Sequence, residues 1–179
     1  MTYQTSVPIV KDSYPSSGYG DDLSIAALWL GLAQNDSTLI SQAKGYFDQF
    51  QLASGLPDSV FNWDSPLPGI PILGTQIYHS YPQLGGDGWQ SQAEAYLDRL
   101  VSGKGAGKLT KGSPTSSSHV LVLTLNHLGG LLYYKEASPL ASLNPAINAA
   151  MLLRRYAAIA TTTDKTNAYL VINSSSPLR

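Results

Sequence analysis

The stretch SSGYGDDLSIAALWLGLAQND, residues 16–36, determines the predicted fold class of this chain. Over residues 21–34, apolar side chains fall on every side of a helical wheel, which is typical of a helix that is buried all round. Asp21 and Asp22 stand in its first turn, where carboxylates complement the helix dipole and the free N–H groups. We therefore predict a buried helix at 21–34, with Tyr19 at its rim.

The residues that follow predict an amphipathic partner for this helix. Residues 35–37, Asn-Asp-Ser, form a break and a cap for the next helix. Over 38–53, apolar side chains share one helical face and polar side chains the other. A buried helix, a short turn and an amphipathic helix make a helical hairpin with an inner and an outer member.

The same pattern returns twice along the chain. After a Pro- and Gly-rich loop at 54–69, an apolar helix is predicted at 70–80 and an amphipathic one at 89–101. A third apolar helix is predicted at 144–160, with Asn144 as N-cap and Pro145 at the first helical position, and another begins at 161–172. Residues 1–17 are expected to be loop or extended chain. Repeated helical hairpins without strands predict an all-α fold, part of an α/α toroid whose inner helices form a barrel wall.

Composition excludes several classes of function. The net charge is -1 with no cluster of Lys or Arg, which argues against a nucleic-acid partner. No apolar run approaches the roughly 20 residues that span a bilayer, so we expect no membrane partner. Cysteine is absent, which removes disulfide and thiolate chemistry. None of His79, His119 and His127 has a second ligand at metal spacing, and we expect neither metal nor cofactor.

Three segments, in this order, resemble glycoside hydrolase family 9, the inverting endo-β-1,4-glucanases, especially fungal-type members. They are SSGYGDDLSIAALWL (16–30), FNWDSPLPG (61–69) and GGLLYYKEASPLASLNPAINAAMLLRRYA (129–157). The resemblance implies an (α/α)6 barrel of the six-hairpin glycosidase type, of which this chain would form about half. It also implies a secreted, extracellular enzyme that cuts cellulose or related β-glucans, although residues 1–15 lack the apolar core of a signal peptide.

Two N-x-S triplets bear on the same expectation of secretion. They begin at Asn35 and at Asn173, and such triplets are acceptor patterns for N-glycosylation. Short patterns of this kind also arise by chance, so they agree with secretion only weakly.

The resemblance also implies where the catalytic groups of the family lie. Its members activate water with an aspartate in an N-terminal Asp-Ala-Gly-Asp-type motif and donate a proton from a glutamate near the C-terminus. Neither motif occurs in this sequence. Asp21 and Asp22 cannot replace them, because neighbours on a helix project in different directions while an inverting pair stands about 6.5–9.5 Å apart across the bond. We expect no catalytic residue here, and a chain that is inactive alone.

Three residues are candidates for binding a β-glucan. Trp63 lies on an irregular loop, where a flat indole suits the face of a sugar ring, or it anchors the loop to the barrel. Tyr19 matches a tyrosine at the family's substrate groove, or it packs under a loop. Asp64 either binds sugar hydroxyls or caps the residues that follow. Glu136 is interpreted as a solvated loop residue.

Two segments depart from the family pattern. Residues 113–129 have no counterpart, and removing them would join GKLTKG directly to GLLYY; residues 173–179 form an atypical tail. Either these segments are mistranslated sequence in a fragmentary gene, or 113–129 is a genuine insertion that forms a short strand or a helix. Sequencing of the mature transcript separates these alternatives.

The expected half barrel has a physical consequence. Apolar faces around Ala27 and Ala150 would meet water or another chain, so we expect self-association or marginal folding. Two other interpretations stay open: a non-catalytic helical-hairpin module that binds glycan or protein, and a complete small enzyme on a shortened toroid.

Overall fold

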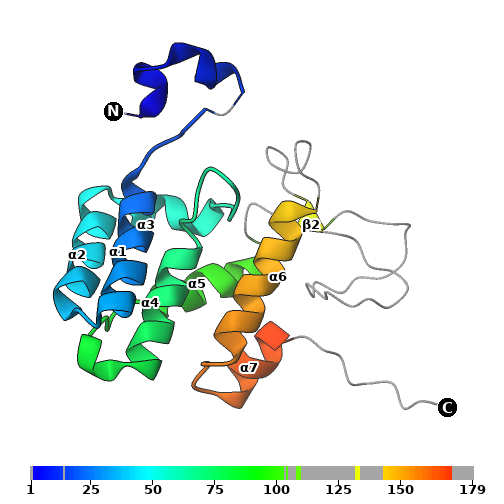
Figure 1. The fold of residues 1–179 in the computed structure, drawn as a ribbon. Coiled ribbons are helices and arrows are strands. Elements are labelled where there is room, and N and C mark those ends of the chain that lie inside the picture. Colours follow the sequence, from blue (N-terminus) through cyan, green and yellow to red (C-terminus); the bar gives the residue numbers. More distant parts are fainter. Residues whose placement is uncertain are drawn as a thin grey trace. The chain divides into compact units, whose positions relative to one another are not determined.

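The computed structural model describes residues 2–13, 15–102, 104, 108–109, 132–133 and 143–170 (Figure 1). Helices account for nearly all the secondary structure in these residues, which confirms the predicted all-α class. The chain divides into two compact units, Met1–Ala93 and Glu94–Arg179. Residues 113–129 and 173–179, together with His119, His127, Glu136 and Asn173, lie outside the described residues.

The first unit contains the first predicted hairpin and the predicted apolar helix that follows the Pro- and Gly-rich loop. Its 3₁₀ turns at the start replace the loop or extended chain expected there. The last helix of the unit, α5, continues into the second unit. The elements in chain order are η1 (Tyr3–Thr5), η2 (Pro8–Asp12), α1 (Gly20–Gln34), α2 (Ser37–Gln49), α3 (Leu52–Gly55), η3 (Leu56–Asp58), α4 (Gly69–Ser80), η4 (Pro82–Leu84) and α5 (Gln90–Val101).

The turn between α1 and α2 forms as the sequence predicts. Asn35 takes a left-handed conformation, with φ 56° and ψ 42°, and ends α1. The N–H of Asp36 then donates to the carbonyl of Gly31 at 2.8 Å. Oδ1 of Asp36 accepts a hydrogen bond from the N–H of Thr38 at 2.7 Å and so caps α2. The residue that ends α1 and the residue that caps α2 are therefore adjacent, and together they turn the chain so that α2 lies beside α1 (Figure 1).

Close approach of helices holds the core of this unit together. The hydroxyl of Ser24 on α1 donates to the carbonyl of Ala43 on α2 at 2.8 Å, in a fully buried position. Gly74 on α4 lies directly against the indole of Trp89, which is 1% exposed. The same indole meets the ring of Phe47 edge to face, with centroids 5.0 Å apart. Trp89 therefore joins α2 and α4 at the centre of the core.

The expectation that α1 is buried on all sides was wrong. Its buried face packs on α2 and α4 and includes Ala27 and Leu28. The opposite face is exposed, because within the described part of the chain no element covers it. Trp29 is 51% and Leu30 47% exposed. The exposed apolar face thus centres on Trp29, not on Ala27. This face, called the α1 outer face below, comprises Leu23, Ala26, Trp29, Leu30 and Ala33.

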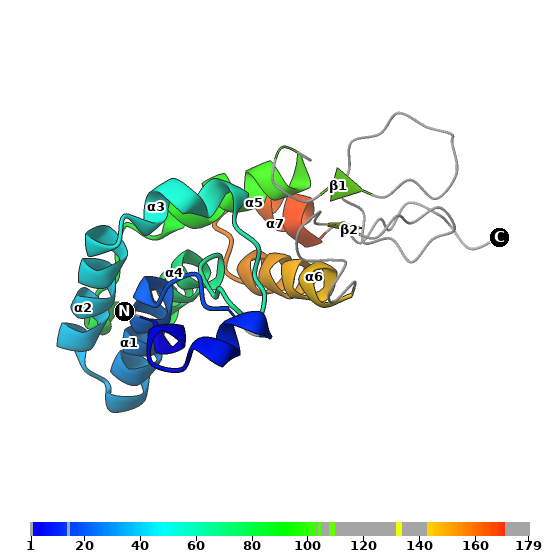
Figure 2. The ribbon, with the colours of Figure 1, turned by 90° about the horizontal axis from the view of Figure 1, so that it is seen from above.

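The second unit contains the end of α5, a short strand pair, α6 (Asn144–Ala157) and α7 (Thr163–Leu170). Strand β1 (Lys108–Leu109) pairs antiparallel with β2 (Leu132–Tyr133), so that Leu109 stands opposite Leu132. The views in Figures 1 and 2 both show α7 folded back beside α6. This pair is the helical hairpin predicted for the C-terminal part.

The start of α6 differs from the prediction. Leu143 is the N-cap and Asn144 is already helical, which places Pro145 in the first turn one position later than expected. The side chain of Asn144 accepts from Nδ2 of Asn148 at 2.7 Å and does not cap the helix. Leu143, Ile147 and Met151 are exposed along one side of α6. Among the described helices, none has both the length and the apolar character needed to cross a membrane.

Candidate functional site

The loop before α4 is shaped by one asparagine. Oδ1 of Asn62 accepts hydrogen bonds from the N–H groups of Asp64, at 2.9 Å, and Ser65, at 3.0 Å. The N–H of Asn62 donates to the carbonyl of Ser65 at 3.2 Å, which closes the turn. Side-chain turns of this kind are a standard use of Asn. Trp63 stands at the tip of the turn, and the residue is 54% exposed.

Two hydrogen bonds fasten this loop to the entry of α1. The N–H of Ser17 donates to the carboxylate of Asp64, 3.2 Å from Oδ1 and 3.3 Å from Oδ2. The hydroxyl of Ser65 donates to Oδ2 of Asp21 at 2.6 Å. Segments more than 40 residues apart in sequence are thus joined at one end of α1, and Trp63 directly precedes the two fastening residues. Asp64 holds the α1 entry and does not cap the residues that follow it.

Tyr19 is the last residue before α1. Its ring meets Phe50 edge to face with centroids 5.3 Å apart, and 41% of the residue is exposed. Gly20 makes this contact possible, because a Cβ there would overlap the Phe50 side chain. Tyr19 therefore packs against Phe50 and still exposes part of its surface to solvent at the N-terminal end of α1.

Three neighbouring carboxylates, those of Asp21, Asp22 and Asp64, make the N-terminal end of α1 negatively charged. Burial raises the pKa of the Asp22 carboxyl above its usual value, and the neighbouring charges of Asp21 and Asp64 raise it further. Such a surface repels anions and offers many acceptor oxygens. It suits a neutral ligand rich in hydroxyl donors. Within the described residues, no group of three or more His, Cys, Asp or Glu side chains is arranged to hold a metal ion.

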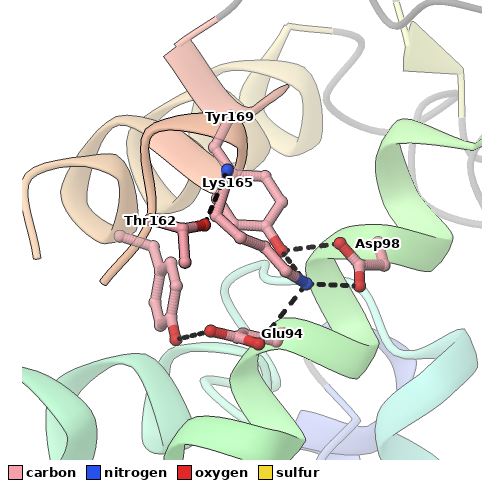
Figure 3. A network of polar contacts seen from close by, with 6 residues as sticks. Glu94, Asp98, Thr162, Lys165 and Tyr169 are labelled. Carbon is pink, nitrogen blue, oxygen red and sulfur yellow. Dashed lines mark hydrogen bonds and ion pairs between the residues drawn. The ribbon is translucent and has the colours of Figure 1, made fainter. Parts of the chain in front are cut away.

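A second polar cluster lies in the other unit, where α5, α6 and α7 meet (Figure 3). Nζ of Lys165 lies 2.7 Å from Oδ2 of Asp98 and 3.3 Å from Oε2 of Glu94. The hydroxyl of Tyr169 donates to Oδ1 of Asp98 at 2.6 Å. The hydroxyl of Tyr156 donates to Oε1 of Glu94 at 2.9 Å. We call these five residues the Lys165 cluster.

Four groups of the Lys165 cluster are stabilised in the charge states they have at neutral pH: Asp98, Tyr156, Lys165 and Tyr169. Burial alone would raise the pKa of Asp98, but hydrogen bonds from Lys165 and Tyr169 outweigh it and lower that pKa. Burial would likewise lower the pKa of Lys165, and its two carboxylate partners raise it. Burial and the carboxylates raise the pKa of both tyrosine hydroxyls. Such groups do not exchange protons readily near pH 7, so we interpret the cluster as structural.

The structure brings the segments that carry Tyr19, Trp63 and Asp64 together at the N-terminal end of α1. The sequence alone had left each of these residues with two interpretations. Sequence reasoning missed Asn62, Ser65 and Ser17. The pattern Asn-x-Asp-Ser at 62–65 is a local signal for the turn and could have been used. The bonds to Ser17 and Asp21 have no local signal, because their partners are 47 and 44 residues away.

Comparisons with a family model and with curated proteins all indicate one family. The family model for glycosyl hydrolase family 9 matches residues 1–175. Endoglucanase 2 of Arabidopsis thaliana is 32% identical over 142 residues, which are 75% of this chain and 24% of that protein. Endoglucanase 5 of Oryza sativa subsp. japonica is 29% identical over 133 residues, 70% of this chain and 25% of that protein. The chain spans about a quarter of the length of these relatives. No solved structure matches it.

Proposed function

Because the chain belongs to glycosyl hydrolase family 9, we propose that it is a segment of an inverting endo-β-1,4-glucanase that hydrolyses cellulose or related β-glucans. The relatives that it matches are endoglucanases, and it spans about a quarter of their length. The role of this segment is to bind the glucan. Its place of action is extracellular, as the family resemblance implies.

One observation supports the binding role most strongly: an exposed indole stands on a loop that is fastened to the α1 entry. The turn at Asn62 and the bonds of Asp64 and Ser65 fix the backbone on both sides of Trp63. A loop held in this way positions the ring before ligand arrives, so little conformational entropy is lost on binding. An anchoring role would bury the indole, whereas Trp63 is 54% exposed.

The neighbouring side chains complement a sugar chain. Indole and phenol rings offer flat apolar faces to the C–H groups of a pyranose, and the hydroxyl of Tyr19 can exchange hydrogen bonds with sugar hydroxyls. The carboxylate of Asp64 uses its two oxygens on the single N–H of Ser17, which leaves lone pairs for sugar hydroxyls. We assign Trp63 and Tyr19 to stacking and Asp64 to hydroxyl recognition.

A titration with cellohexaose tests the binding role. Trp63→Ala is expected to weaken binding by about tenfold, near the upper end of what one aromatic contact contributes. Trp29→Ala is the matched control, because Trp29 is 51% exposed but lies on the α1 outer face, in the middle of the helix. Equal affinities of the Trp63→Ala variant and the unmodified chain in calorimetry would remove the assignment.

We further propose that this chain contains no catalytic pair. An inverting mechanism needs an acid and a base about 6.5–9.5 Å apart with a water between them. Asp21 is buried and accepts a hydrogen bond from the hydroxyl of Ser65, and Asp64 accepts one from the N–H of Ser17. Asp22 directly follows Asp21 on the helix. Release of reducing ends from carboxymethyl-cellulose by the purified chain should equal that of buffer. Turnover above buffer would contradict this part of the proposal.

The α1 outer face supports a proposal of self-association with a second copy of the chain. Trp29 and Leu30 are about half exposed in the middle of an apolar helix, and such a surface gains free energy when another apolar surface covers it. Sedimentation velocity should show a dimer whose fraction rises with concentration. Leu30→Glu should shift the protein to monomer, whereas Gln49→Glu on the exposed side of α2 should not. A monomer at all concentrations would contradict the proposal.

A further inference from the structure

Asn35 begins the triplet Asn35-Asp36-Ser37, which has the acceptor pattern for N-glycosylation. The structure places the triplet at the turn between α1 and α2, with Asn35 exposed in the left-handed conformation. Within the described part of the chain, the side-chain amide of Asn35 has no hydrogen-bond partner. Its Nδ2 is therefore open to solvent and to a bulky substituent.

The side chains of the two residues after Asn35 leave its amide accessible. The Asp36 carboxylate points along α2 and caps it by accepting from Thr38. Ser37 is the first residue of α2 and is exposed, and the cap does not use its hydroxyl. The left-handed conformation alone explains an Asn or a Gly at position 35. It does not explain a hydroxyl two residues later, which is the second requirement of the acceptor pattern.

We propose that Asn35 is a site of N-linked glycosylation, an inference that rests on the extracellular location proposed above. The donor is an oligosaccharide joined to a lipid diphosphate. Nδ2 of Asn35 attacks the anomeric carbon, the new N–C bond forms, and the bond between that carbon and the diphosphate oxygen breaks. The lipid diphosphate leaves with the bonding electrons, and the proton lost from Nδ2 passes to a base of the transferase.

The position of this site is compatible with glucan binding. Tyr19 immediately precedes α1 and Asn35 immediately follows it. A helix of 15 residues is roughly 22 Å long at about 1.5 Å per residue. An oligosaccharide on Asn35 therefore extends from the end of α1 opposite to the Trp63 loop. The glycan should leave the affinity for cellohexaose unchanged.

The test is secretion of the full chain, behind a cleavable leader, from a eukaryotic host. Peptide N-glycosidase treatment in heavy-oxygen water converts a glycosylated Asn to labelled Asp, and peptide mapping separates Asn35 from the second triplet at Asn173. We expect the label at Asn35 in the unmodified chain and in Ser37→Thr. We expect it to be absent in Ser37→Ala, which keeps Asn35 and the Asp36 cap.

Two outcomes would overturn the inference: an unlabelled Asn35 in the secreted chain, or a label at Asn35 that persists in Ser37→Ala. Asn35→Gly tests the fold separately, since glycine keeps the left-handed turn without the amide. Its thermal unfolding should match that of the enzymatically deglycosylated chain. Cellohexaose binding is measured on the same material. Binding without a glycan contradicts only this inference, and a glycan without binding contradicts only the proposed function.

Discussion

The hydroxyl of Ser65 and the carboxylate of Asp21 are 2.6 Å apart, across 44 residues of sequence. Asp21 is 8% exposed, so the hydroxyl replaces water that the carboxylate has lost on folding. We predict that Ser65→Ala lowers the free energy of unfolding by about 1–3 kcal/mol, because it leaves a buried acceptor without its partner. Urea unfolding followed by circular dichroism measures this loss.

The control for this prediction is Ser54→Ala. Ser54 also donates a hydrogen bond, but to the carbonyl of Gln51 in its own exposed turn. Its removal should change the unfolding free energy by less than about 0.5 kcal/mol. Ser65→Thr, which keeps a hydroxyl, should recover most of the loss. Equal stabilities of the two alanine variants would show that the Ser65 bond does not fasten the loop.

Replacement of two helical glycines by alanine should change the stability of the protein in opposite directions. A Cβ at Gly74 would overlap the Trp89 indole, which is buried and cannot move aside, so Gly74→Ala should destabilise by about 1–3 kcal/mol or more. A Cβ at Gly45 on α2 meets nothing within 4 Å, so Gly45→Ala should stabilise by about 0.5–1 kcal/mol. Thermal unfolding of both variants tests this, and a shift in the same direction for both would contradict the packing described for Trp89.

The Lys165 cluster should make stability depend on pH in a defined window. The pKa of Asp98 is lowered, so its contribution is present above the ordinary value of 3.8 and is lost as pH falls through the lower folded value. The pKa of Lys165 is raised, so its contribution is complete below 10.5 and is lost as pH rises through the higher folded value. The pKa of Tyr169 is also raised, so stability falls as pH rises above 10.0.

We therefore expect Lys165→Met to destabilise the protein most between about pH 4 and 10, with a smaller difference at either extreme. The comparison variant is Lys44→Met. Lys44 pairs with Asp48 one turn along α2 on the exposed surface, and such pairs contribute about 0.3–0.5 kcal/mol. Unfolding free energies measured across this pH range provide the test. A flat difference between Lys165→Met and the unmodified chain would show that the cluster adds no linked stability.

We propose that residues 113–129 are an insertion that the fold does not need. Leu109 pairs with Leu132, so the two strands that flank the insertion already lie side by side. Removing 113–129 leaves Thr110, Lys111, Gly112, Gly130 and Leu131 between the strands, a length usual for a hairpin loop. The deletion variant should unfold at or above the denaturation temperature of the full chain. A clear loss of stability would mean that the segment contributes to the fold.

The sequence predicted features that depend on neighbours along the chain. The Asn35 turn, the Asp36 cap and the succession of helices along the chain follow from local patterns, and the structure confirms them. The exposure of Trp29 was not predictable, because periodicity shows that a face is apolar but not whether another element covers it. The bond between Ser65 and Asp21 was equally hidden, since the fold alone brings the two residues together.

Binding of β-glucan by the Trp63 loop can be followed through the tryptophan side chains themselves. The chain has three: Trp63 on the loop, Trp29 on the α1 outer face, and Trp89 in the core. A two-dimensional NMR titration of their indole N–H signals with cellohexaose distinguishes these positions. We expect the Trp63 signal to shift in a saturable manner while those of Trp29 and Trp89 stay in place. An unmoved Trp63 signal, or a shift confined to Trp29, would contradict this expectation.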